Sequence, residues 1–82
     1  MQTLFINAND YPTPRELHLA LQRLLHLPAH YGCNADALYD CLSERKETVN
    51  LCILSFGNEG VAEALRKCSA VIEDLGGEIR QL

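Results

Sequence analysis

A run of eight residues near the middle of the chain, Val49 to Phe56, reads VNLCILSF and is almost continuously apolar. Strands of parallel sheets that are covered on both faces have this pattern, whereas a strand with one wet face alternates apolar and polar residues. We therefore expect a strand covered on both faces. Because parallel strands need long crossover connections, which are usually helices, helices should flank this run in the sequence.

The start of a first helix is marked clearly in the sequence. Thr13 is a typical N-cap, Pro14 fits the first helical position, and Glu16 completes a capping box. Pro28 disfavours the helical conformation in the residue before it, so this helix should end near His26-Leu27. Residues at helical spacing give it one apolar face: Leu17, Leu21, Leu24 and Leu25.

Two further helices are expected. One covers about residues 35–44, and Asn34 before it can accept backbone N–H groups of the first turn as an N-cap. The other follows the turn at residues 57–60 and is closed by Gly76-Gly77, one of which should be left-handed. Its apolar residues recur at helical spacing: Val61, Leu65, Cys68, Ile72 and Leu75.

Short strands are expected at both ends of the chain. Thr3–Ile6 is apolar and is followed by a turn, and Glu78–Leu82 alternates Ile79 inward with Arg80 outward, as an edge strand does. The order is then β-α-α-β-α-β. Strands separated by helices favour right-handed crossovers, so we predict a three-layer α/β fold with a three-stranded parallel sheet covered by helices.

Length and composition fit one domain over residues 1–82. The chain is 48% apolar and 22% charged, with a formal net charge of −4. Its seven Lys and Arg residues are scattered, so direct nucleic-acid binding, which needs a basic stripe, is not expected; a basic protein partner would be attracted. No apolar run is long enough for a membrane span, and nothing resembles a signal peptide. We expect a cytoplasmic protein that is monomeric when free.

The cysteines and histidines do not predict a cofactor or a metal site. The spacings between the four cysteines match no zinc pattern, and in a cytoplasmic chain they should be structural thiols, with Cys33 in an exposed loop the most reactive. His18 and His26 lie on the first expected helix, eight residues apart, without a third ligand. We expect both at the surface or flanking the core, and no bound metal.

Three acids recur every four residues along the second expected helix. Asp36, Asp40 and Glu44, called the acidic row below, should therefore lie on one face, where stacked like charges cost a few tenths of a kcal/mol per pair. Such a row is most often a solvated face. Here, however, Tyr39 lies beside it, and an aromatic next to carboxylates is typical of an interface anchor. The row therefore favours binding of a basic partner.

This part of the chain resembles the barstar family of intracellular ribonuclease inhibitors. The resemblance is most convincing from Leu17 to Leu42, and the order of elements extends it over the whole chain. The family's loop and second helix read tyrosine-rich, Gly, Asn, Asp-Ala-Leu-aromatic-Asp-Cys-Leu. The matching residues are Tyr31-Gly32, Asn34 and Asp36-Ala37-Leu38-Tyr39-Asp40-Cys41-Leu42.

The resemblance implies a barstar-like fold and a function as an inhibitor. In barstar-like proteins this helix plugs the active site of a basic, barnase-type ribonuclease, and the acid at the Asp40 position stands where a substrate phosphate would be. The acid at the Asp36 position makes further polar contacts, and the aromatic at the Tyr39 position packs on the enzyme. The partner-binding residues implied are His30, Tyr31, Gly32, Asn34, Ala35, Asp36, Tyr39, Asp40 and Ser43.

The chain departs from the family pattern at several positions. His30 stands where the pattern has Tyr, Tyr39 where it has Trp, and Arg45 where it has an aromatic residue after the helix. Arg45 would oppose a basic enzyme unless it turns away. The last helix supplies a further acid in the family, for which Glu73 is the nearest counterpart. These differences affect which ribonuclease is bound more than the class of target.

Two other functions were weighed. Catalysis would need His30, Asp36 and Asp40 as acid–base groups or Cys33 as a nucleophile, but acids on a convex helix in so small a domain leave little room for a pocket. The Gly57–Gly60 turn also lacks the spacing and Lys of a phosphate loop. We do not expect an enzyme. The alternative kept open is an interaction module of the same fold whose target is not a ribonuclease.

Overall fold

Strand β2 (Val49–Ser55) is the centre of a three-stranded parallel sheet, between β1 (Gln2–Asn7) and β3 (Ile79–Gln81). The computed structural model describes residues 2–82. In register, Leu51 of β2 lies opposite Leu4 of β1 on one side and Ile79 of β3 on the other. The short 3-10 helix η1 (Ala8–Asp10) follows β1 directly.

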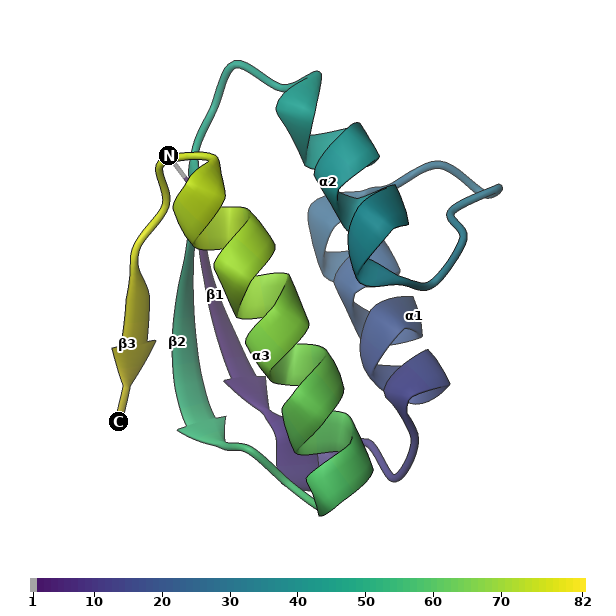
Figure 1. Cartoon of the computed structure of the whole chain (residues 1–82), viewed down its shortest axis with the longest axis vertical. Coiled ribbons are helices and arrows are strands. Elements are labelled where there is room, and N and C mark those ends of the chain that lie inside the picture. The colour runs from purple at the N-terminus through teal and green to yellow at the C-terminus, as the bar shows by residue number, and fades with distance from the viewer. Residues whose placement is uncertain (1) are drawn as a thin grey trace.

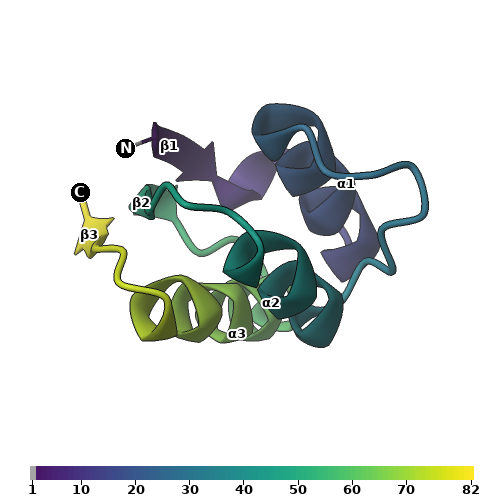
Figure 2. The same ribbon diagram turned by 90° about the horizontal axis from the view of Figure 1, so that it is seen from above.

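Three α-helices complete the chain, α1 (Pro14–Leu25), α2 (Ala35–Ser43) and α3 (Glu59–Asp74). The order β1-α1-α2-β2-α3-β3 and the parallel sheet confirm the predicted α/β fold. Seen from above, the strands stand together at one side and all three helices lie on the same side of the sheet (Figure 2). In Figure 1, α3 runs along the sheet, with α1 and α2 beyond it.

The sheet is covered on one face, so the expectation of cover on both faces is wrong. Burial alternates along β2, where Leu51 and Ile53 are buried while Leu54 is 50% exposed. On β1, Phe5 is 62% exposed between the buried Leu4 and Ile6. The apolar run was misleading because its outward positions hold apolar residues that no helix covers.

Helix α3 is the element that joins the sheet to the other helices. It packs against β2, β3 and η1, and on its other sides against α1 and α2. The buried side chains of the sheet and of the three helices form one cluster, in which the fully buried members include Ile6, Leu17, Leu21, Leu25, Leu38, Leu51, Val61, Leu65 and Ile72. Helix α2 therefore rests on α3 rather than on the sheet.

The helix ends follow the predicted capping chemistry. The Thr13 hydroxyl accepts the Glu16 backbone N–H at 3.2 Å, which confirms Thr13 as the N-cap of α1. Helix α1 ends at Leu25, one or two residues earlier than expected, and Leu24 is 39% exposed, outside the predicted apolar face. Gly76 has a φ of +93°, the left-handed conformation expected after α3. No helix within residues 2–82 is long and apolar enough to cross a membrane.

Gly77 is required for the approach of the α3–β3 connection to β2. A Cβ added there would lie 1.9 Å from the carbonyl oxygen of Val49 and 2.7 Å from Cγ2 of Ile72. Gly77→Ala should therefore push the two backbones apart and lower the free energy of unfolding by about 3 kcal/mol, the upper end of ordinary overpacking costs. Urea unfolding followed by circular dichroism measures the change.

Gly60 provides the matched control. It lies in the first turn of α3, and a Cβ there would meet only Oδ1 of Asn58, at 3.6 Å. Gly60→Ala should leave stability unchanged or raise it by up to about 1 kcal/mol, because Ala restricts the unfolded chain and favours the helix. Equal stability of the two variants would contradict the assigned role of Gly77.

Candidate interface around helix α2

Asn34 fixes the start of α2. Its side-chain oxygen accepts the Ala37 backbone N–H at 2.8 Å, and its carbonyl accepts the Leu38 N–H at 3.0 Å, the first bond of the helix. The Asn34 amide nitrogen also donates to the Gly32 carbonyl at 3.3 Å. The predicted N-cap is confirmed, and the α1–α2 loop (residues 26–34) is tied to the helix that follows it.

The acidic row lies on the outer face of α2. Asp36, Asp40 and Glu44 are all exposed, while Leu38 and Leu42 on the opposite face are buried against the core. Among the residues that the structure describes, no ion pair involves any of the three acids. The face therefore presents free carboxylates to the surroundings.

Other predicted residues of the helix surround this row. Tyr39 is 44% exposed, and Ser43, also exposed, donates its hydroxyl to the carbonyl of Asp40 at 3.1 Å. Ala35, half-buried in the first turn, lies at the other end of the helix. The structure thus brings an aromatic ring and the acids together on one exposed surface.

A surface hollow of about 430 Å³ separates the α1–α2 loop from α2. His30 stands on the loop side, and Asp40 and Glu44 on the helix side. His30 and Gly32 are exposed, so the loop and the acidic row form one continuous surface. A basic or aromatic side chain of a partner would meet carboxylates on one wall of this hollow and an imidazole on the other.

Tyr31 points into the protein and is only 7% exposed. Its hydroxyl lies 2.7 Å from Nδ1 of His18 and donates to the Asn34 carbonyl at 3.4 Å. Burial raises the pKa of Tyr31 well above its ordinary value, so the phenol stays protonated. Tyr31 was predicted at the partner surface, but it offers little area there; it supports the loop from within.

His18 is 3% exposed, so its predicted place at the surface is wrong. The imidazole lies between α1 and α3, where Nε2 is 3.9 Å from Sγ of Cys68. Burial lowers the pKa of His18 and raises that of the Cys68 thiol to about 12. A signal was available in the sequence, because His18 precedes Leu21 by three residues and Leu25 by seven, which places it on the apolar face.

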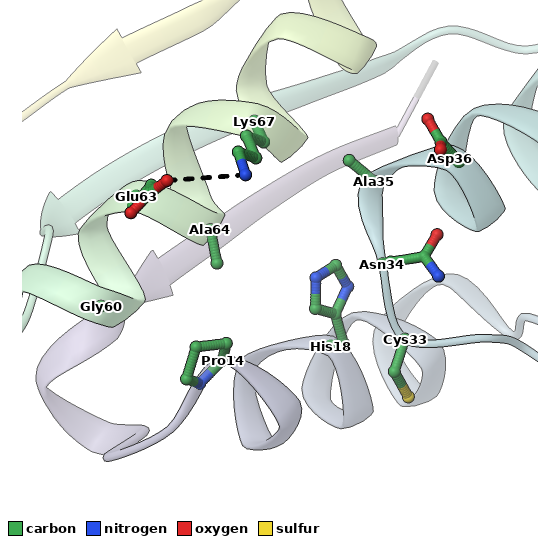
Figure 3. Close-up of a pocket in the computed structure, with 10 residues that line it drawn as sticks. All are labelled: Pro14, His18, Cys33, Asn34, Ala35, Asp36, Gly60, Glu63, Ala64 and Lys67. Atoms are coloured by element: carbon green, nitrogen blue, oxygen red, sulfur yellow. Dashed lines mark ion pairs between the residues drawn. The ribbon is translucent and has the colours of Figure 1, made fainter.

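A second hollow, of about 670 Å³, lies behind the start of α2 (Figure 3). His18 rises from α1 toward Ala64 of α3, while the side chain of Cys33 points away from them. Glu63 and Lys67 pair across its rim at 3.5 Å, with both side chains 66% exposed, so the pair adds little stability.

Arg45 turns away from the acidic row. Its guanidinium donates to the carbonyls of Leu25 and His26, at the C-terminal end of α1. These carbonyls have no partner within the helix, and the negative end of its dipole favours a cation. Arg45 therefore joins the ends of α1 and α2. Sequence reasoning missed this role because the two residues it contacts lie about twenty positions away.

The described residues contain no group of three or more His, Cys, Asp or Glu side chains that could hold a metal ion. The four cysteines are free thiols, with Cys68 buried and Cys33, Cys41 and Cys52 half-buried. The interface consists of carboxylates, an aromatic ring and loop backbone, a set of groups suited to contact with a protein.

A protein-family model described as "Barstar (barnase inhibitor)" matches residues 1–80. The chain belongs to the barstar family. The match confirms the resemblance read from the loop and second helix, and extends it to both terminal strands. Within this barstar-family chain, the residues that departed from the family pattern now have places: His30 and Tyr39 are exposed, and Arg45 caps α1.

The buried imidazole makes stability depend on pH. Because the folded pKa of His18 lies below that of the unfolded chain, the unfolded state binds a proton more readily. Above about pH 6.5 the imidazole is neutral in both states. As the pH falls below that value, the free energy of unfolding should decrease until the pH passes the lowered pKa of the folded protein.

Urea unfolding of the wild type and of His18→Gln between pH 7.5 and 5 measures this contribution. The variant should lose less stability than the wild type on acidification, because its side chain does not titrate. Equal slopes for the two proteins would show that His18 contributes nothing to the acid sensitivity.

Proposed function

We propose that this barstar-family protein inhibits a basic, barnase-type ribonuclease in the cytoplasm by placing α2 and the α1–α2 loop over its active site. Inhibition is by occlusion, at one inhibitor per enzyme, without turnover. The observation that carries the proposal is the acidic row: three exposed carboxylates on one helix face, without ion-pair partners among the described residues and beside the exposed ring of Tyr39.

The chemistry of the row suits an enzyme that binds RNA. An active site that holds phosphates carries cations, and these accept a carboxylate in place of a phosphate through charge-assisted hydrogen bonds. In the proposed complex Asp40 takes the phosphate position, Asp36 makes further polar contacts, and Tyr39 packs on the enzyme. His30, Gly32, Asn34, Ala35 and Ser43 border this contact, and Tyr31 keeps the loop in shape.

The orientation of Arg45 supports the same proposal. A cation beside the acidic row would repel a basic enzyme, but here the guanidinium is committed to the C-terminal carbonyls of α1. The acids thus keep their full attraction for a basic cleft. Glu73, exposed in the last turn of α3, is a further acid that a large enzyme could reach.

A barstar-fold module with a different target is the second candidate, and the exposed His30 and Tyr39 favour it, since they replace the larger aromatic residues of the family pattern. Titration of purified protein into a panel of small secreted microbial ribonucleases separates the two. Inhibition of RNA cleavage with an equivalence point near one to one supports the ribonuclease inhibitor. No inhibition across barnase-type enzymes by well-folded protein would leave the module.

Replacement of Asp40 tests the proposed contact directly. Asp40→Ala should leave thermal stability unchanged or slightly raised, because the change relieves like-charge repulsion with Asp36 and Glu44. Binding should nevertheless weaken by about 2–5 kcal/mol, a range to which complexes of this inhibitor family have contributed, because the enzyme's cations would be buried without a counter-charge. Calorimetric melting and inhibition constants measure the two effects.

Two comparisons make the Asp40 result specific. Asp10→Asn removes one charge from an exposed Asp in η1, outside α2 and its loop, and should change binding little. Asp36→Ala should weaken binding less than Asp40→Ala does. Undiminished inhibition after loss of Asp40, in a protein of native stability, rules out the phosphate-mimic mechanism.

The acidic row should also speed association. An acidic surface that meets a basic cleft raises the association rate constant through long-range attraction, which salt screens. Stopped-flow measurements between about 0.05 and 0.5 M NaCl should show a steep fall in this constant and a smaller change in dissociation. Asp36→Asn should flatten the salt dependence more than Asp10→Asn does; identical slopes would place the acids outside the encounter surface.

A further inference from the structure

A chain of buried polar groups connects α3, α1 and the α1–α2 loop. His18 of α1 is 3% exposed and Cys68 of α3 is fully buried. The imidazole Nδ1 is 2.7 Å from the Tyr31 hydroxyl, and Nε2 is 3.9 Å from Sγ of Cys68. The two rings are tilted by 51°, with centroids 5.8 Å apart. One side chain therefore bridges two helices and the loop.

The protons in this chain can be assigned from its far end. The Asn34 carbonyl can only accept, so the Tyr31 hydroxyl uses its single proton on it. The hydroxyl oxygen must then accept from His18, which places the imidazole proton on Nδ1. Nε2 of the neutral ring is left as an acceptor for the Cys68 thiol, which burial keeps protonated. Each group thus donates one proton.

The chain ends at the peptide where α2 begins. The Asn34 carbonyl that accepts from Tyr31 also accepts the Leu38 N–H, the first hydrogen bond of the helix. Within residues 26–34 only Leu27 and Tyr31 are buried, so the loop has few other anchors. The direction of the Tyr31 hydroxyl therefore bears on both the loop and the first turn of α2.

We propose that His18 is a positioning residue for the partner-binding face. As the Nδ1-protonated tautomer it directs the Tyr31 hydroxyl onto the Asn34 carbonyl, and so holds the loop and the first turn of α2 in one shape. Fully satisfied buried polar chains rigidify a structure, whereas an apolar residue at position 18 would fill the space without setting a direction. The consequence for ribonuclease binding rests on the proposed function; the ordering of the loop does not.

The first test needs no ribonuclease. Nitrogen-15 NMR of the imidazole should show the proton on Nδ1; protonation of Nε2 in the neutral ring would overturn the proposal. In Tyr31→Phe, which keeps the ring, amide hydrogen exchange at Ala37 and Leu38 should accelerate at least roughly fivefold relative to the Leu65 amide of α3. Ile53→Val, a small core deletion in β2, should leave this ratio unchanged.

A matched pair at position 18 separates positioning from packing. The amide of Asn can occupy the place of Nδ1 and still donate to Tyr31, whereas the amide of Gln reaches the place of Nε2, toward Cys68. His18→Asn should keep the exchange ratio of Leu38 to Leu65 close to wild type, and His18→Gln should raise it as Tyr31→Phe does. The same ratio in both variants would show that only volume matters at this position.

Binding is the last readout. With a ribonuclease that the wild type inhibits, Tyr31→Phe and His18→Gln should slow association, because a smaller fraction of the protein has the competent loop, and His18→Asn should restore the rate. Unchanged association rates in Tyr31→Phe would overturn the positioning role. If the wild type inhibits no ribonuclease, the proposed function fails, while the tautomer and exchange experiments still decide the role of His18.

Discussion

The packing of α3 between the sheet and the other two helices is the constraint on which the rest of the structure depends. The sheet buries one face, and α3 covers it through side chains such as Leu65 and Ile72. Helices α1 and α2 then pack on α3, so α2 takes its position from another helix and not from the strands. The acids on its outer face are placed by apolar contacts on its inner face.

Local chemistry was predictable from the sequence and long-range contacts were not. Asn34 and Gly76 end or begin helices through hydrogen bonds and φ values that involve neighbouring residues, and both were predicted. The exposure of Phe5, the burial of His18 and the contact of Arg45 with α1 depend on elements far apart in the sequence. The acidic row was predicted because a helical period fixes a face, whereas its supporting contacts come from the tertiary fold.

The interface keeps its charges at some expense of stability. Asp36, Asp40 and Glu44 repel one another along α2, and the nearest basic residue of the helix end, Arg45, is turned to α1 instead of neutralising them. A surface optimised for stability alone would alternate the signs of its charges. The unneutralised row is intelligible when the counter-charges are supplied by another molecule, and the rigid start of α2 keeps it ready for that encounter.

The dependence of α2 on α3 also has a consequence for synthesis of the chain. Strand β1 must wait for its parallel partner β2, more than forty positions later, and α2 must wait for α3, which emerges later still. Domains with such non-local pairing form slowly and as a unit. On a translating ribosome the inner face of α2 therefore has nothing to pack against until the final third of the protein has left the exit tunnel.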